Sequence, residues 1–105
     1  MSYILVAEDD QFLNKMYKIN LEDEGYTLKF VTNGEQAIES IDRQKPDLLI
    51  LDLLMPKVDG FAVLEHIKSK GYAIPTMILT NLSQDVDQEK CKELGAADFF
   101  VKSDM

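Results

Sequence analysis

Short apolar runs in this sequence are followed directly by residues whose side chains can do chemistry. These residues are Glu8, Asp9 and Asp10 after the first run, Asp52 after the third, Thr80 after the fourth and Lys102 after the fifth. Hard divalent cations prefer carboxylate ligands, and an ammonium and a hydroxyl group can hydrogen-bond to anions. If the fold brings these groups together, they form a strongly charged site.

Each of these residues, taken alone, also fits an ordinary structural role. An acid after a strand often caps the next helix, a threonine suits a strand end, and a lysine often protects a sheet edge. Capping does not explain Asp52, which interrupts the otherwise apolar residues 48–55, where an isolated charge is costly. We therefore interpret Asp52 as a functional residue.

Five strand-sized apolar runs alternate with segments that have helical spacing. Strands are expected at residues 3–7, 28–31, 48–51, 77–79 and 99–101, and helices near residues 13–21, 34–44, 61–70 and 83–94. Near-continuous apolar strands separated by helices are typical of an α/β fold with a doubly wound parallel sheet. We predict five strands in the flavodoxin-like order 2-1-3-4-5.

This predicted topology has two consequences. With right-handed crossovers, the first helix lies on one face of the sheet and the second, third and fourth lie on the other face. Ligands of such sheets bind outside the carboxyl ends of the strands, so the polar residues after the strands are expected to converge at one edge.

Length and charge restrict the classes of function. The chain has 105 residues, which is enough for one domain. It contains 11 Lys and Arg residues against 19 Asp and Glu residues, a formal net charge of −8, which argues against direct contact with nucleic acid or with anionic membranes. With one cysteine, no leader-like segment and no membrane-spanning apolar run, a cytoplasmic location is expected.

The residues after the strands, together with a motif after Asp52, resemble one known family. The marks are the acidic pair Glu8 and Asp9, Asp52 followed by Met55-Pro56 and Asp59-Gly60, Thr80 at the end of the fourth strand, and Lys102 at the end of the fifth. Spacings of 43, 28 and 22 residues separate Asp9, Asp52, Thr80 and Lys102. This pattern is similar to the receiver domain of two-component response regulators and covers residues 3–102.

The resemblance implies a role for each of these residues. Asp52 would accept a phosphoryl group from a phosphohistidine of a sensor histidine kinase or a phosphotransfer protein. Mg²⁺ would be held by Glu8, Asp9, Asp52 and the backbone carbonyl of Leu54. Lys102 and Thr80 would bind the phosphoryl oxygens. The domain would be a signalling module rather than an enzyme, and it would promote its own phosphotransfer and dephosphorylation.

The resemblance also implies a switch that has two states. Thr80 would move toward the phosphoryl group while Phe99 turns inward, which would change the surface formed by the fourth helix and fifth strand. An ordinary core ring is the alternative interpretation of Phe99. The readout would be a downstream effector protein or an output domain that is missing here.

Three features depart from the family pattern. Asn81 follows Thr80 where a smaller residue is usual, which would narrow access for small phosphodonors. Ser103 follows Lys102 where a proline is usual, so the family's placement of this lysine does not carry over directly to Lys102. A fifth helix is absent before the end at Met105, so we expect a single domain, residues 1–105, truncated after the fifth strand. The apolar face left bare by that helix would drive self-association.

Two alternative functions follow from the same residues. A phosphatase of the haloacid dehalogenase type also uses an aspartate nucleophile at a strand end, but it needs a second aspartate two residues later, where this chain has Leu54. A pseudo-receiver, which binds a protein and is not phosphorylated, is disfavoured by the intact acids, Thr80 and Lys102. Ser103 and the absent helix leave that alternative open.

Two further residues are assigned to packing or to the surface. We expect His66 to be a solvated residue on the polar side of the third helix. Cys91 falls on the apolar side of the fourth helix and is expected to be a small core residue.

Overall fold

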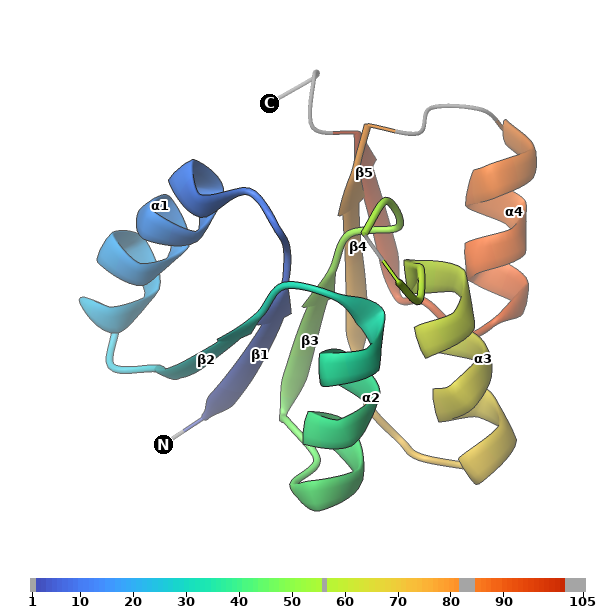
Figure 1. Ribbon diagram of the computed structural model, residues 1–105, viewed down its shortest axis with the longest axis horizontal. Coiled ribbons are helices and arrows are strands. Elements are labelled where there is room, and N and C mark those ends of the chain that lie inside the picture. Colours follow the sequence, from blue (N-terminus) through green and yellow to red (C-terminus); the bar gives the residue numbers. More distant parts are fainter. Residues whose placement is uncertain (1, 56, 82–84, 102–105) are drawn as a thin grey trace.

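A parallel sheet of five short strands forms the centre of the computed structural model, which describes residues 2–55, 57–81 and 85–101 (Figure 1). The strands are β1 (Tyr3–Ala7), β2 (Thr27–Val31), β3 (Leu48–Leu51), β4 (Thr76–Thr80) and β5 (Asp98–Val101). Their order across the sheet is β2-β1-β3-β4-β5, and all pairings are parallel. The predicted fold class and strand order are therefore confirmed.

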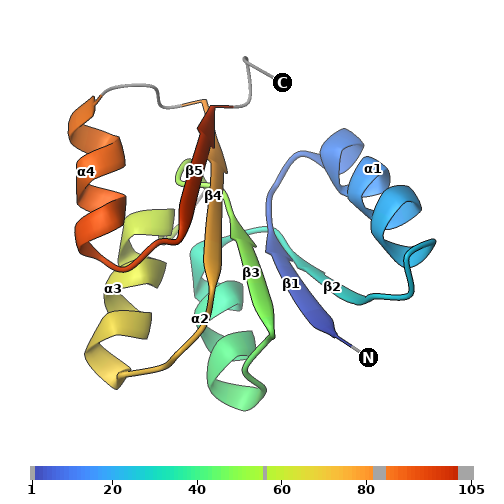
Figure 2. The same ribbon diagram turned by 180° about the vertical axis from the view of Figure 1, so that it is seen from behind.

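Four helices connect these strands. They are α1 (Gln11–Glu22), α2 (Gly34–Arg43), α3 (Gly60–Lys70) and α4 (Asp85–Glu93). Figures 1 and 2 show α1 on one face of the sheet and α2, α3 and α4 on the other, as the handedness argument predicts. The predicted start of α4 at Ser83 falls outside the described residues. None of the helices described is both long and apolar enough to cross a bilayer.

Short polar side chains start three of the helices. Asp10 accepts hydrogen bonds from the N–H groups of Phe12 and Leu13, Asn33 accepts one from Gln36, and Asp59 accepts one from Ala62. A helix leaves its first N–H groups without partners inside the helix, and such caps satisfy some of them. The connections from β1 to α1 and from β2 to α2 are short, whereas residues 52–59 separate β3 from α3.

Alternating residues of the strands point to opposite faces of the sheet and belong to two separate cores. Leu5, Leu49 and Ile78 are fully buried on the side covered by α2, α3 and α4. Ile4 and Ile50 are buried on the side of α1, where Tyr17 packs against the same group of residues. Because both faces of the sheet are covered, these strands are almost wholly apolar in sequence. Cys91 is also fully buried, as expected.

Two glycines allow close packing of the segment after β3. A β-carbon on Gly60 would lie 2.5 Å from the carbonyl oxygen of Asp52, and one on Gly34 would overlap the carbonyl oxygen of Val58. The amino ends of α2 and α3 therefore press directly against the segment that follows Asp52. This close approach gives a physical reason for the glycine in the Asp59-Gly60 pair.

A hydrogen-bonded cluster joins α2 to α3 and corrects the interpretation of His66. The Nε2 atom of His66 lies 2.8 Å from Oδ1 of Asp42, and the hydroxyl of Tyr72 donates to the same oxygen at 2.9 Å. The ammonium of Lys45 lies 4.2 Å from the centre of the Tyr72 ring. His66 is thus engaged with an acid on the neighbouring helix, which sequence spacing alone did not reveal.

Asp42→Asn is expected to destabilise the protein at neutral pH and to have less effect in acid. Hydrogen bonds from His66, the larger cause, and from Tyr72 lower the pKa of the Asp42 carboxyl group below its ordinary value of 3.8. Such a group stabilises the folded state above its unfolded-state pKa, and this contribution is lost as the pH falls through the folded-state pKa. Urea unfolding of the wild type and the variant, from neutral pH to below 3.8, measures the change.

Glu39→Gln is the matched control, because Glu39 is an exposed acid on the same helix. Its effect on stability is expected to be small and nearly independent of pH. A destabilisation by Asp42→Asn that is equally large at every pH would contradict the assignment.

Candidate functional site

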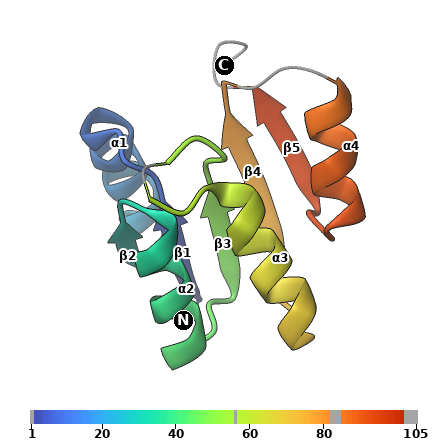
Figure 3. The ribbon, with the colours of Figure 1, turned by 45° about the vertical axis from the view of Figure 1, so that its right-hand side comes forward.

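The carboxyl ends of the strands meet at one edge of the sheet. The arrowheads of β3, β4 and β5 point the same way in Figure 3. Glu8 directly follows β1, Asp52 directly follows β3, and Thr80 is the last residue of β4. The N–H of Asp52 donates to the carbonyl oxygen of Ala7 at 3.0 Å, so the ends of the neighbouring strands β1 and β3 are in register. Glu8, Asp52 and Thr80 therefore lie at the same edge of the sheet, as expected for residues that end or follow parallel strands.

Three carboxylates form a cluster at this edge. One ligand oxygen each from Glu8, Asp9 and Asp52 lies within 4.8 Å of the other two. Glu8 is 2% exposed and Asp52 is 4% exposed, whereas Asp9 is exposed to solvent. Carboxylates at this separation repel each other, and a hard cation relieves that repulsion. The donor set of three carboxylates therefore fits a divalent metal ion such as Mg²⁺.

Asp10 has a different task from its two neighbours. Its side chain caps α1, and its own N–H donates to Oε2 of Glu8 at 3.1 Å. The amide nitrogen of Asn14 donates to the carbonyl oxygen of Glu8 at 2.9 Å. The turn that carries Glu8 and Asp9 is thus tied to the first turn of α1, a feature that the sequence analysis missed because Asn14 belongs to no recognised motif.

The orientation of the Asp52 carboxylate is fixed by the next turn of the chain. The N–H of Leu54 donates to Oδ1 of Asp52 at 3.1 Å. The neighbouring side chains of Leu53 and Met55 are buried, whereas that of Leu54 is exposed. Leu54 is therefore held beside Asp52 by its backbone, and a metal-ligand role for its carbonyl stays a prediction.

Thr80 and Phe99 occupy neighbouring strands. Thr80 is fully buried and pairs with Val101 in the register of β4 and β5. Phe99 is half-buried, packs against the core on the side of α2, α3 and α4, and lies near Cys91 of α4. Both placements are compatible with a core role and with a switch role.

Lys102 and Ser103 lie outside the described residues. Val101, the residue before Lys102, is the last residue of β5 and is aligned with Thr80. The strand that leads to Lys102 therefore runs toward the edge that holds the acidic cluster.

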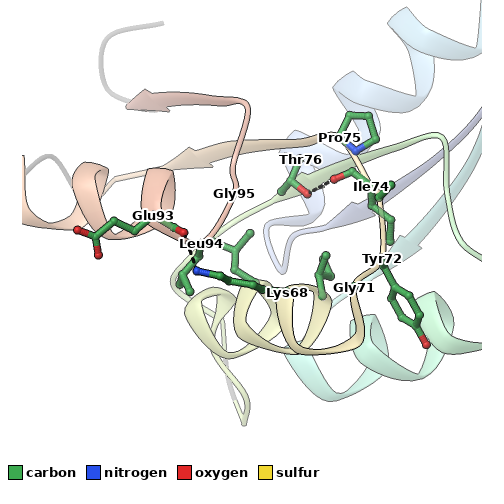
Figure 4. A pocket seen from close by; sticks show the side chains of 12 residues that line it. Lys68, Gly71, Tyr72, Ile74, Pro75, Thr76, Glu93, Leu94 and Gly95 are labelled. Atoms are coloured by element: carbon green, nitrogen blue, oxygen red, sulfur yellow. Dashed lines mark hydrogen bonds between the residues drawn. The ribbon is translucent and has the colours of Figure 1, made fainter.

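A separate cavity of about 550 Å³ lies between α3 and α4 (Figure 4). Its lining includes residues 71–75, which precede β4, the first residue of that strand, Thr76, and Gly95, which precedes β5, so it opens at the amino ends of the strands. Lys68 donates from its ammonium group to the carbonyl oxygen of Glu93 at 3.1 Å. The cavity is at the opposite end of the sheet from the acidic cluster and is not part of that site.

Comparison with known proteins identifies the family. The model of the family described as response regulator receiver domain matches residues 4–104. The chain belongs to this family. This membership confirms the resemblance drawn from the sequence and removes the phosphatase alternative.

Individual receiver proteins resemble the chain over almost its whole length. The alkaline phosphatase synthesis transcriptional regulatory protein PhoP of Bacillus subtilis is 33% identical over 99 residues, which are 94% of this chain and 41% of that protein. The signal receiver domain of a LuxO repressor protein from Vibrio parahaemolyticus is 34% identical with a TM-score of 0.91, covering 96% of this chain and 78% of that one. The chain spans less than half the length of the Bacillus relative.

A receiver domain from a different kind of protein is similarly close. The signal receiver domain of a signal transduction histidine kinase from Syntrophus aciditrophicus is 36% identical with a TM-score of 0.85. The match covers 97% of this chain and 79% of that chain. Receiver domains therefore match this chain whether they come from transcriptional regulators or from kinases.

Mg²⁺ is expected to raise the Tm of this receiver domain, and Asp52→Asn to raise the Tm in the absence of metal. Each close pair of carboxylates repels by up to about 4 kcal/mol at an effective dielectric constant of about 20, and either change reduces this repulsion. Thermal unfolding with Mg²⁺ and with a chelator measures both effects.

The exposed acid Asp23 lies outside the cluster, so Asp23→Asn serves as the control and should keep the response to Mg²⁺. A wild-type Tm that does not respond to Mg²⁺ would argue against the metal site.

Proposed function

We propose that Asp52 is the phosphoacceptor of this receiver domain and that the donor is a phosphohistidine of a sensor histidine kinase or a phosphotransfer protein. The observation that carries this proposal is the buried carboxylate of Asp52, at a strand end, within 4.8 Å of the carboxylates of Glu8 and Asp9. Burying a carboxylate beside other carboxylates costs folding free energy, and such groups are concentrated at functional sites.

In the proposed reaction an oxygen of the Asp52 carboxylate attacks the phosphorus of the phosphohistidine. A phosphorus–oxygen bond forms while the phosphorus–nitrogen bond breaks, and its electron pair leaves with the imidazole nitrogen. Phosphoryl transfer requires positioning and charge neutralisation more than covalent assistance. The N–H of Leu54 contributes to positioning, because its hydrogen bond to Oδ1 limits rotation of the carboxylate.

Glu8, Asp9, Asp52 and the backbone carbonyl of Leu54 are the proposed metal-binding groups. Mg²⁺ bound there supplies positive charge that offsets the carboxylates and the phosphoryl oxygens. Burial of Glu8 and Asp52 leaves Asp9 as the solvent-facing member of the set.

Thr80 and Lys102 are proposed to bind the phosphoryl oxygens, by a hydroxyl and an ammonium group respectively. Thr80 is suited to this role because it ends β4 at the same edge as Asp52. Movement of Thr80 toward the phosphoryl group, coupled to Phe99, is the proposed switch of the surface formed by α4 and β5. The half-buried position of Phe99 supports this, since a ring that is partly exposed has room to turn.

An exposed apolar stripe on α1 supports a protein as the phosphodonor. Phe12, Met16 and Ile19 are spaced by one helical turn each, and all three are exposed. The stripe begins next to the acidic cluster, because α1 starts directly after Asp10. Apolar residues grouped in this way are typical of a surface that contacts another protein.

We further propose that residues 1–105 form one signalling domain in the cytoplasm, acting through a downstream effector protein or an output domain. The domain promotes its own phosphotransfer and dephosphorylation rather than turning over a separate substrate. The name of the Bacillus subtilis relative describes a transcriptional regulatory protein. This supports an output in gene regulation without direct nucleic acid contact by the acidic receiver domain.

Intact mass measurement after incubation with acetyl phosphate and Mg²⁺ tests the phosphoacceptor. We expect one phosphoryl adduct on the wild type and on Asp23→Asn, and none on Asp52→Asn, because only the last variant lacks the nucleophile. Phosphoramidate serves as a second small donor, because Asn81 is expected to narrow the access. An adduct that persists on Asp52→Asn would overturn the assignment, and no adduct with either donor would favour the pseudo-receiver alternative.

Self-association is proposed through an apolar groove between α1 and the sheet. The groove has a volume of about 370 Å³, and Ile4, Leu21, Ile50 and Met77 are among the residues that line it. Phe100 follows Phe99 in β5, so its side chain points to the same face as the groove, where it is 44% exposed. A second copy of the chain presents the same groove, so a symmetric contact between two copies would bury the groove and the Phe100 side chain of each.

Sedimentation of residues 1–105 tests this contact. The wild type is expected to form dimers at high concentration, and Met77→Lys to remain monomeric because it places a charge in the groove. Ser69→Lys, at an exposed position on α3, is the control and should dimerise like the wild type. A wild type that is strictly monomeric at high concentration would rule out the proposed dimer.

A further inference from the structure

Asn14 is a buried polar residue on the inner side of α1. It is 7% exposed, and the half-buried residues of the same helix are Leu13, Tyr17 and Leu21. An amide at such a position must form hydrogen bonds or it lowers the stability of the folded state. Its bonding therefore indicates what the residue does.

Within the described residues, the side-chain amide of Asn14 makes one hydrogen bond, and its partner belongs to the turn that carries the acidic cluster. Its Nδ2 atom donates to the carbonyl oxygen of Glu8 at 2.9 Å. Among the described residues its Oδ1 atom has no hydrogen-bond partner, although it is buried. An apolar side chain of similar shape would avoid that unpaired acceptor. The hydrogen bond to Glu8 is therefore the interaction that favours an amide at this buried position.

This bond completes the fixation of the turn between β1 and α1. The N–H of Glu8 donates to the carbonyl oxygen of Val31 at 3.0 Å, and the carboxylate of Glu8 accepts the N–H of Asp10 at 3.1 Å. The backbone N–H of Asn14 donates to the carbonyl oxygen of Asp10 at 3.1 Å. Asn14 thus holds both ends of the turn, through its side chain at Glu8 and through its backbone at Asp10.

We propose that Asn14 is a positioning residue for the metal site. By holding the carbonyl of Glu8, it keeps the carboxylates of Glu8 and Asp9 in place beside that of Asp52. The inference rests on the proposed metal-binding role of these three acids. Residues that orient metal ligands without touching the metal typically change metal affinity by about 10- to 100-fold when they are replaced.

Asn14→Leu separates positioning from simple packing. The substitution removes the bond to Glu8 and also removes the unpaired Oδ1, so folding stability is expected to stay the same or to rise. The Kd for Mg²⁺, measured by titration calorimetry on the full chain, is expected to increase by about tenfold. A purely structural role for Asn14 predicts the reverse pattern, a loss of stability with an unchanged Kd.

Ser40→Ala is the matched control. Ser40 is also buried, and within the described part of the chain its hydroxyl has no hydrogen-bond partner, but it lies on α2 on the other face of the sheet. Its removal is expected to leave the Kd for Mg²⁺ unchanged. Asn14→Ala is the second variant. If the leucine variant does not fold, the Kd of Asn14→Ala for Mg²⁺ is measured at low temperature instead.

The outcomes distinguish the positioning role of Asn14 from the existence of the metal site. Weaker Mg²⁺ binding by the folded Asn14 variants and normal binding by Ser40→Ala would support the positioning role. Equal binding by the wild type and the Asn14 variants would overturn it and leave the metal site intact. A wild type that does not bind Mg²⁺ would overturn the metal site and the positioning role together.

Discussion

The arrangement of this molecule depends on holding three carboxylates close together at one edge of a sheet. Glu8, Asp9 and Asp52 have oxygens within 4.8 Å of one another, and two of these acids are almost fully buried. Like charges at this distance separate unless the backbone that carries them is rigid. The hydrogen bond from Asp52 to Ala7 supplies part of that rigidity, because it joins two strands that are buried on both faces.

Helices α2 and α3 extend this rigidity to the segment after β3. Gly34 and Gly60 let the amino ends of α2 and α3 touch the backbone that follows Asp52. Farther along these helices, Asp42 accepts a hydrogen bond from Tyr72 and lies in contact with His66. The two helices are therefore joined near both ends, so that the segment beside Asp52 has little freedom to move.

The fourth helix is attached to α3 in a different way. Among its described side chains, Cys91 is the one that is fully buried. Lys68 donates to the carbonyl oxygen of Glu93, and the ammonium of Lys90 lies 4.4 Å from the centre of the Phe61 ring. Contacts of long, flexible lysines at a surface hold less firmly than buried apolar packing. The acidic cluster thus lies where the helices are fixed by close backbone packing, whereas α4 is joined to α3 by contacts that are easier to break.

The sequence by itself determined the sheet, the strand order and the edge at which Glu8, Asp52 and Thr80 meet, because these follow from local runs of apolar residues and from what comes directly after them. Motif spacing also identified the family. Only the tertiary structure decided that Asp10 caps α1, that Asn14 holds Glu8, and that His66 contacts Asp42. The reason is physical: these roles depend on distances set by how helices pack, whereas apolar periodicity shows only which side of an element faces the core.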